Sequence, residues 1–261
     1  MSGRRAAVLG SPIAHSRSPQ LHLAAYRELG LTDWTYDRIE CTEAQLPGLV
    51  SGFGPEWVGV SVTMPGKFAA LRFATERTQR AELVGSANTL VRVDGGWRAD
   101  NTDVDGVVGA LGEVSGPAAV LGSGGTAPAA VVALAELGVR DLTIVARNAD
   151  KAAALVTLGD KLGVHARWVA LGEPLDSLGV VVNTLPADVA SQFSGTVADA
   201  AVLLDAIYDP WPTPLAAAVA SAGGRVVSGL QMLLSQAFAQ VVQFTGMPAP
   251  REAMAAALAA S

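Results

Sequence analysis

The segment Gly122-Ser123-Gly124-Gly125-Thr126-Ala127 is a glycine-rich turn between two apolar stretches. Ala118–Leu121, just before it, is an apolar run of strand length. Residues 129–137, just after it, are rich in alanine and are followed by Gly138, which predicts a helix with a glycine stop. The order strand, turn, helix is the opening of a Rossmann-type α/β unit.

The small residues of this turn suit a bound dinucleotide. Gly122 permits the tight turn, Gly124 lets a pyrophosphate approach the backbone, and Ala127 allows the helix to pack closely on the strand. The positive start of the following helix would hold the phosphates. We therefore predict that Gly122, Ser123, Gly124, Gly125, Thr126 and Ala127 bind a dinucleotide.

The end of the next strand selects the dinucleotide. Asp141–Ala146 reads as that strand, and it ends about 20 residues past the glycines, where an NAD-binding unit usually carries an acid for the ribose hydroxyls. Here Arg147 follows instead, and an arginine can pair with a ribose 2′-phosphate. The sequence thus predicts NADP, held by Arg147 with Lys151. The alternative is that both are solvated charges at the start of a helix.

The composition favours a cytoplasmic enzyme. The chain has 261 residues, of which 50% are hydrophobic, enough for a large core in one or two domains. A single cysteine, Cys41, excludes an internal disulfide framework. The net charge of −6 and the 5% aromatic content argue against nucleic acid as a partner. We see no targeting or membrane segment, because glycine and proline interrupt the longest uncharged stretch.

Two α/β lobes are predicted along the chain. In the first, β-like runs at 6–9, 34–39, 57–63 and 89–93 alternate with helical segments at 19–29 and 42–50. The second continues from the glycine turn through apolar runs at 180–182, 202–204 and 225–227. Residues 229–246 and 251–260 read as helices that return to the first lobe. We expect a substrate domain of residues 1–102 completed by 230–261, and an NADP-binding Rossmann domain of residues 103–229.

A lysine and an aspartate stand out in two separate motifs. Lys67 closes the sequence Ser-Val-Thr-Met-Pro-Gly-Lys, and Asp103 closes Asp-Asn-Thr-Asp. A lysine and a carboxylate that meet in a cleft can move a proton to or from a hydroxyl group. Beside a dinucleotide, this pair predicts a dehydrogenase. The alternative for Lys67 is an exposed lysine at the start of a helix.

Several motifs occur in one fixed order along the whole chain. They are the run from Gly10 to His22 (GSPIAHSRSPQLH), Val62-Thr63-x-Pro65-x-Lys67, Asn88-Thr89, Asn101-Thr102-Asp103, the glycine turn, and Asp205-x-x-Tyr208-x-Pro210-x-x-Thr213-Pro214-Leu215 before Gly229-x-x-Met232-Leu233-x-x-Gln236-Ala237. In these motifs the chain resembles the shikimate dehydrogenase family. The resemblance implies reversible, NADP-dependent reduction of 3-dehydroshikimate to shikimate, in the chorismate pathway to aromatic amino acids.

The resemblance also implies roles for single residues. Lys67 and Asp103 would flank the reacting C3 hydroxyl and exchange its proton. The residues implied to bind substrate are Ser16, Ser18, Thr63 and Tyr208 around the carboxylate, and Asn88 and Gln236 at the ring hydroxyls. Thr184 and Gly229 would lie on the cofactor side.

Some of these residues have simpler readings. Ser16 and Ser18 could cap the helix that begins near Pro19, and Asn88 could be a turn residue. His15 and His22 lack a nearby acid cluster, so no metal is expected.

The chain departs from the family pattern at a few positions. Leu23 and Ser61 stand where the family often has asparagine, so a substrate hydrogen bond is expected to be shorter or missing. Ala146 and Asn148 replace the asparagine and threonine that commonly flank the arginine.

Two other functions remain open at this point. One is a quinate/shikimate dehydrogenase, against which Arg147 counts. The other is a non-catalytic NADPH-binding regulator, against which the presence of both Lys67 and Asp103 counts. The expected partners are a small-molecule substrate alone, without nucleic acid or membrane, in a monomer or homodimer.

Overall fold

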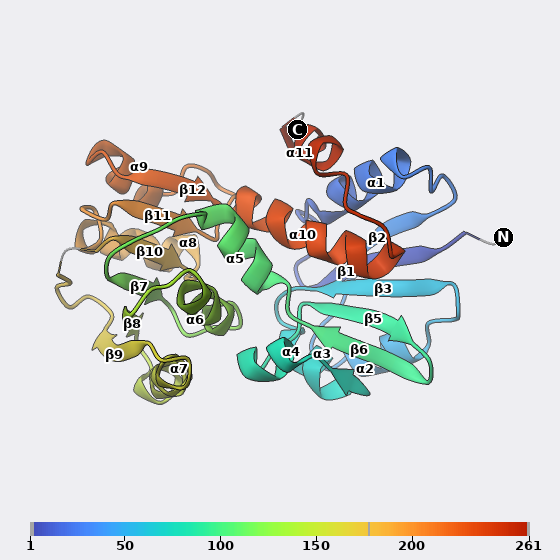
Figure 1. Cartoon of the computed structure of the whole chain (residues 1–261), viewed down its shortest axis with the longest axis horizontal. Helices are drawn as coiled ribbons and strands as arrows, with labels where there is room; N and C mark the ends of the chain where they lie inside the picture. Colours follow the sequence, from blue (N-terminus) through green and yellow to red (C-terminus); the bar gives the residue numbers. More distant parts are fainter. Residues whose placement is uncertain (1–2, 177, 260–261) are drawn as a thin grey trace. The chain divides into compact units, whose positions relative to one another are not determined.

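The computed structural model describes residues 3–176 and 178–259, which fold as two compact units (Figure 1). The first unit is Met1–Thr102 with Leu234–Ser261, and the second is Asp103–Leu233. The C-terminal boundary, between Leu233 and Leu234, falls inside one helix, α10 (Gly229–Thr245). The two ends of the chain thus contribute to the same unit.

A mixed six-stranded sheet forms the centre of the first unit, in the order β2-β1-β3-β5-β6-β4. Its strands are β1 (Arg5–Gly10), β2 (Thr35–Glu40), β3 (Trp57–Val62), β4 (Glu76–Arg77), β5 (Thr89–Val93) and β6 (Gly96–Asp100). β1 pairs in parallel with β2 and β3, whereas β5 runs antiparallel to β3 and β6. The β5–β6 register sets Thr89 opposite Asp100, so two of the sequence motifs lie side by side.

Helices cover both faces of this sheet (Figure 1). On one face lie α1 (Ser18–Glu28), α10 and α11 (Arg251–Ala259), and on the other α2 (Leu46–Ser51), α3 (Lys67–Phe73) and α4 (Gln79–Val84). The alternation of side chains along β3 serves both faces. Val60 and Val62 join the apolar core that includes residues of α2 and α3. Ser61 bonds to α10, and Gly59 lacks a side chain because Phe244 of α10 fills the place of its Cβ.

The second unit contains a six-stranded sheet in the order β12-β11-β10-β7-β8-β9, with parallel pairings throughout. Its strands are β7 (Ala118–Leu121), β8 (Asp141–Ala146), β9 (His165–Ala170), β10 (Val180–Asn183), β11 (Val202–Asp205) and β12 (Arg225–Ser228). The first strand of this sheet, β7, is central, and the chain reverses its direction of growth between β7 and β10. This is the doubly wound Rossmann order, whose ligands bind at the carboxyl ends of the strands at that reversal.

Two sets of helices pack with the second sheet. In the first set, α6 (Ala127–Glu136) contacts both α5 (Asp103–Leu111) and α7 (Ala149–Lys161). In the second, α8 (Ala187–Ala190), the 3₁₀ helix η1 (Ser191–Thr196) and α9 (Pro214–Ser221) contact one another. Nearly all of α6 is buried, which explains its alanine- and valine-rich sequence without charges before Glu136.

The predicted fold class is confirmed: two α/β units, the second Rossmann-like, with the C-terminal helices in the first. The helix expected at 42–50 begins only at Leu46. The side chain of Gln45 accepts hydrogen bonds from the backbone N–H and the hydroxyl of Thr42 and closes a turn there instead. Within the described part of the chain, no helix combines the length and the apolar character needed to span a membrane.

Candidate functional site

The two predicted substrate serines lie at the start of α1. Ser16 is partly exposed and Ser18 is buried, and the Ser16 hydroxyl lies 3.3 Å from Ser18 Oγ. Ser16 Oγ also accepts from the backbone N–H of Ser18 at 3.3 Å. The N-cap residue is Arg17, and no side-chain hydrogen bond is made from it. Of the two serines, only Ser16 helps to cap the helix, because its hydroxyl accepts from one N–H of the first turn.

Thr63 and Lys67 occupy the connection from β3 to α3, as the sequence predicts. The backbone N–H of Thr63 donates to Leu9 at the end of β1 at 2.8 Å, and Thr63 O accepts from Gly66 at 2.9 Å. Lys67 is the first residue of α3 and is partly exposed, and its carbonyl accepts from the N–H of Ala87 at 3.0 Å. Lys67 thus starts a helix, yet its backbone is tied to the segment that precedes Asn88.

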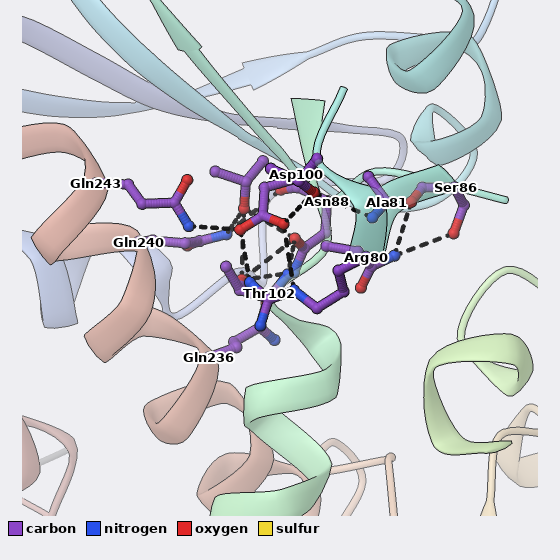
Figure 2. Close-up of polar contacts among 12 residues, drawn as sticks. Arg80, Ala81, Ser86, Asn88, Asp100, Thr102, Gln236, Gln240 and Gln243 are labelled. Atoms are coloured by element: carbon purple, nitrogen blue, oxygen red, sulfur yellow. Dashed lines mark hydrogen bonds and ion pairs between the residues drawn. The ribbon is translucent and has the colours of Figure 1, made fainter. Parts of the chain in front are cut away.

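Asn88 is the centre of a buried polar cluster (Figure 2). Its Oδ1 accepts from Thr102 N at 2.8 Å, from Thr102 Oγ1 at 3.2 Å and from Thr89 Oγ1 at 2.8 Å. Its Nδ2 donates to Thr102 Oγ1 at 3.0 Å and to Gln236 Oε1 at 2.8 Å. Asn88 is therefore not a plain turn residue, because its side chain joins β5, the residues after β6 and α10.

Three glutamines of α10 reach this cluster in Figure 2. Gln236 accepts from Asn88, and Gln243 donates to Asp100 Oδ2 at 2.7 Å. Gln240 is buried and donates to Asn88 O at 3.3 Å and to Thr89 Oγ1 at 3.0 Å. Of these three glutamines, only Gln236 is expected from the sequence to have a role. The spacing of 236, 240 and 243 on one helical face was the signal for the others.

Asp100 anchors the segment that leads to Asp103. Burial alone would raise the pKa of Asp100, but hydrogen bonds from Arg80 and Thr78 hold that pKa below its usual value. The ion pair with Arg80 measures 2.6 Å, and Thr78 donates at 2.7 Å. Asn101 Nδ2 donates to the backbone oxygen of Ser86 at 2.9 Å.

Asp103 begins the second unit as the first residue of α5, where it is almost fully buried. A carboxylate in the first turn of a helix is favoured by the helix dipole. The preceding residue, Thr102, is fixed by its bonds to Asn88 in the first unit. The chain therefore passes from the predicted substrate residues to the predicted acid–base carboxylate within one peptide unit.

In the second unit, the glycine turn connects β7 to α6 at the reversal point of the sheet. Gly122 has φ +106°, which favours glycine, and a Cβ there would lie 2.6 Å from Thr184 Oγ1. A Cβ on Gly124 would meet no described heavy atom within 4 Å. Gly122 is thus required by the fold, whereas Gly124 leaves room beside the backbone. Ser123, Gly125 and Thr126 are partly exposed, and Ala127 is buried at the start of α6.

The residues after β8 form the start of α7. Asn148 is its N-cap and accepts from the backbone N–H of Lys151 at 2.8 Å, an interaction worth about 1 kcal/mol. Arg147 and Lys151 are both exposed on either side of this cap. The asparagine that departs from the family pattern therefore has a structural role, and the two cations can reach an anion at this edge of the sheet.

Thr184 follows β10 and lies against the glycine turn. Its hydroxyl and its backbone N–H both donate to Leu121 O, at 2.8 and 2.9 Å. The neighbouring Asn183 donates to Asp205 Oδ1 at 2.9 Å, and Asp205 Oδ2 accepts from Thr213 at 2.6 Å. This buried network fixes the carboxyl ends of β10 and β11.

Tyr208 and Gly229 lie near the same strands. Tyr208 is partly exposed in the loop between β11 and α9. Gly229 is the first residue of α10, and a Cβ there would collide with the backbone oxygen of Ala206. Close packing alone thus accounts for glycine at 229.

The two histidines singled out in the sequence have different surroundings. His22 is buried and stacks on Tyr36 with ring centroids 4.0 Å apart, and His15 is exposed. Among residues 3–176 and 178–259, the acids, histidines and the cysteine form no cluster of three or more that could hold a metal ion.

Comparisons with known proteins agree on one family. The family model for the shikimate dehydrogenase substrate binding domain matches residues 8–90, and that for the shikimate 5′-dehydrogenase C-terminal domain matches residues 229–259. The chain is 39% identical to a shikimate dehydrogenase (NADP(+)) of Methylobacterium radiotolerans, over 95% of this chain and 93% of that protein.

Solved structures give the same result. The crystal structure of Mycobacterium tuberculosis shikimate dehydrogenase is 74% identical, with a TM-score of 0.95 over 99% of this chain and 100% of that one. The Thermus thermophilus shikimate 5-dehydrogenase, solved in complex with NADP(H) and shikimate, is 29% identical with a TM-score of 0.82 over 98% of this chain and 99% of that one. The chain therefore belongs to the shikimate dehydrogenase family.

Proposed function

We propose that the protein is an NADP-dependent shikimate dehydrogenase that interconverts 3-dehydroshikimate and shikimate. Relatives with that name match this chain over nearly their whole length, and the Thermus thermophilus relative binds both NADP(H) and shikimate. The observation that carries the proposal is the orientation of Asn88. Three donors occupy its Oδ1, so its Nδ2 is the group turned toward Gln236 on α10.

The substrate would be bound by short polar side chains of the first domain, residues 1–102 completed by 230–261. Ser16, Ser18 and Thr63, with Tyr208, would bind the carboxylate, since hydroxyl groups donate well to an anion. Asn88 and Gln236 would bind ring hydroxyls. These hydroxyls can accept from an amide N–H and donate to an amide oxygen, because their hydrogens can rotate.

The residues of the second domain, 103–229, fit NADP. The open space beside Gly124 and the start of α6 suit the pyrophosphate, and Gly122, Ser123, Gly125, Thr126 and Ala127 complete this turn. Arg147 and Lys151 would hold the 2′-phosphate, and both are exposed at the end of β8. Thr184 and Gly229 would lie on the nicotinamide side.

The reaction removes two electrons and two protons from the C3 carbinol of shikimate. Bound NADP⁺ would supply the acceptor for the hydride that leaves C3. Lys67 and Asp103 would take the proton from the C3 hydroxyl oxygen as the C–O bond becomes a carbonyl, and would return it in the reverse direction. Such acid–base help is typically worth ~10² to 10⁴ in rate.

We further propose a cytoplasmic enzyme that acts on this small molecule as a monomer or homodimer. The net charge of −6 opposes binding to nucleic acid.

The test is an assay of the purified protein with shikimate or quinate and with NADP⁺ or NAD⁺, in all four pairings. We expect NADPH to form with shikimate. Turnover of quinate with NAD⁺ in preference to that pairing would favour the quinate enzyme. Binding of NADPH without turnover in any pairing would favour the non-catalytic regulator.

A further inference from the structure

Six side chains of the first unit form one continuous chain of hydrogen bonds, which we call the polar chain: Tyr36, Ser61, Gln240, Thr89, Asn88 and Gln236. The Tyr36 hydroxyl donates to Ser61 Oγ at 2.7 Å, and Ser61 Oγ donates to Gln240 Oε1 at 2.8 Å. Gln240 Nε2 donates to Thr89 Oγ1 at 3.0 Å, and Thr89 Oγ1 donates to Asn88 Oδ1 at 2.8 Å. Asn88 Nδ2 then donates to Gln236 Oε1 at 2.8 Å.

Backbone groups fix the direction of this polar chain at both amides. Gln240 Nε2 faces the carbonyl oxygen of Asn88 at 3.3 Å, and a carbonyl oxygen can only accept. Asn88 Oδ1 faces the backbone N–H of Thr102 at 2.8 Å, and an N–H can only donate. Neither amide can be turned around without setting like groups against each other. Every link therefore runs from Tyr36 toward Gln236.

His22 supports the chain at its buried end. Its ring stacks on Tyr36, and its Nε2 lies 3.3 Å from Gln240 Oε1. Because that oxygen is an acceptor, His22 must carry its proton on Nε2. Burial lowers the pKa of His22 to about 3, with the hydrogen bond to Gln240 opposing the shift, so the ring is neutral at pH 7. No charge from His22 then disturbs the polarity of the chain.

The phenol of Tyr36, at the same end of the polar chain as His22, stays protonated, because burial raises the pKa of Tyr36 far above its usual value. The Tyr36 hydroxyl is therefore the donor to Ser61 Oγ with which the polar chain begins.

We propose that Gln240 is a positioning residue for the substrate: through Thr89 and the Asn88 carbonyl, it holds the Asn88 amide so that Asn88 presents only N–H donors to the oxygen of a ring hydroxyl of shikimate. This inference rests on the proposed function and deepens it. Gln240 lies one helical turn beyond Gln236 and is only 2% exposed. Its side-chain amide donates to the backbone oxygen of Asn88 and to the hydroxyl of Thr89, which in turn donates to the Asn88 side chain. Ser61, where the family often has asparagine, serves here as the link that orients Gln240.

Substrate binding would change the bond between Asn88 and Gln236. The second N–H of Asn88 is given to Gln236 Oε1 in this structure. A ring hydroxyl of the substrate whose oxygen accepts from Asn88 replaces that bond and allows Gln236 to turn to a substrate hydroxyl. The exchange depends on Asn88 keeping its orientation.

The experiment compares Gln240→Met with Val241→Ala in steady-state kinetics with shikimate and NADP⁺. Methionine keeps the length of the side chain but cannot donate to Thr89 or Asn88 O. Losing an oriented hydrogen bond at a buried site is expected to raise the KM for shikimate about tenfold, with the KM for NADP⁺ within twofold of wild type. Val241 is a fully buried neighbour on α10, and its truncation controls for lost packing. We expect Val241→Ala to leave both KM values within twofold.

A shikimate KM within twofold of wild type for Gln240→Met would overturn the inference, and so would an equal rise in both variants. If Gln240→Met does not fold, Ser61→Ala removes only one hydroxyl from the polar chain, and we expect a threefold or larger rise in the shikimate KM. An unchanged value there would also overturn it. The activity of the wild-type protein with shikimate tests the proposed function separately. Failure of the proposed function would abolish turnover in the wild type, whereas failure of the Gln240 inference would leave it intact.

Discussion

The side-chain amide of Asn88 donates to Gln236 Oε1 at 2.8 Å, although the two residues lie 148 positions apart in the chain. The C-terminal helix α10 thereby completes a polar cluster that begins with β5 and the residues after β6. Residues 148 positions apart must therefore come together for this cluster to form.

Lys67→Ala should abolish most of the turnover without affecting the fold. The acid–base role predicts a loss in kcat of at least about a hundredfold, the low end of the usual range. The variant should bind NADPH as the wild type does, measured by fluorescence titration. Lys161→Ala, at the end of α7, is the matched control and should keep full activity. Turnover of Lys67→Ala within a fewfold of wild type would rule out the assigned role.

Arg147→Ala should weaken the binding of NADP⁺ but not that of NAD⁺. Hydrogen bonds to a charged group contribute about 1.5–3 kcal/mol, so we expect the KM for NADP⁺ to rise about ten- to a hundredfold. The KM for NAD⁺, which lacks the 2′-phosphate, should hardly change. Arg167→Ala on β9 removes another exposed arginine and serves as the control. Equal effects on both cofactors would show that Arg147 does not read the phosphate.

The two glycines of the turn should respond differently to alanine. Gly122→Ala forces a Cβ onto a residue with φ +106° and against Thr184, so its melting temperature should fall. Gly124→Ala meets open space among the described residues, so its melting temperature should stay close to wild type while NADPH binding weakens. Thermal melts with and without NADPH separate the two. Normal cofactor binding by Gly124→Ala would argue against a pyrophosphate beside Gly124.

His22 should make folding stability depend on pH. Its pKa is about 3 when folded and about 6.5 when unfolded, so the unfolded chain takes up a proton that the folded chain refuses. The contribution of neutral His22 to the free energy of unfolding is fully present above pH 6.5. It falls by about 1.4 kcal/mol per pH unit as the pH drops toward 3. Between pH 6.5 and 5 this amounts to about 2 kcal/mol.

Urea unfolding of His22→Phe measures this contribution, because phenylalanine keeps the stacking on Tyr36 and cannot titrate. Its loss of stability from pH 6.5 to 5 should be smaller than that of wild type by about 2 kcal/mol. His165→Gln, at an exposed position, should behave as wild type does. An identical pH dependence in His22→Phe would mean that His22 is not held neutral.

Local patterns were enough to predict five of the six strands of the Rossmann unit, all except β9. Strand β8 was expected at its observed bounds, because its residues from Leu142 to Ala146 are buried and form an unbroken run with few polar positions. The position of Lys67 after β3 was also predicted, since Thr-x-Pro-x-Lys marks the end of a strand and the start of a helix. Sequence spacing alone carried this information.

Other elements gave no such signal. β6, with the sequence Gly-Trp-Arg-Ala-Asp, has one buried aromatic and a charged end, and its pairing with β5 rather than its own residues makes it a strand. Gln240 shares a helical face with Gln236, but this spacing does not show which distant residues Gln240 bonds. Its bonds reach 151 and 179 positions back along the chain, to Thr89 and Ser61. Ser61 is expected from the sequence to shorten or remove a substrate hydrogen bond, and in the structure its hydroxyl is bonded to Tyr36 and Gln240.

The most direct test of the central claim uses shikimate carrying deuterium on C3, incubated with the protein and NADP⁺. Mass spectrometry of the reduced cofactor then shows where the hydride came from. We expect one deuterium in the NADPH formed, in equal amount to the 3-dehydroshikimate produced. NADPH without deuterium, or no NADPH at all, would contradict oxidation at C3 and with it the proposed function.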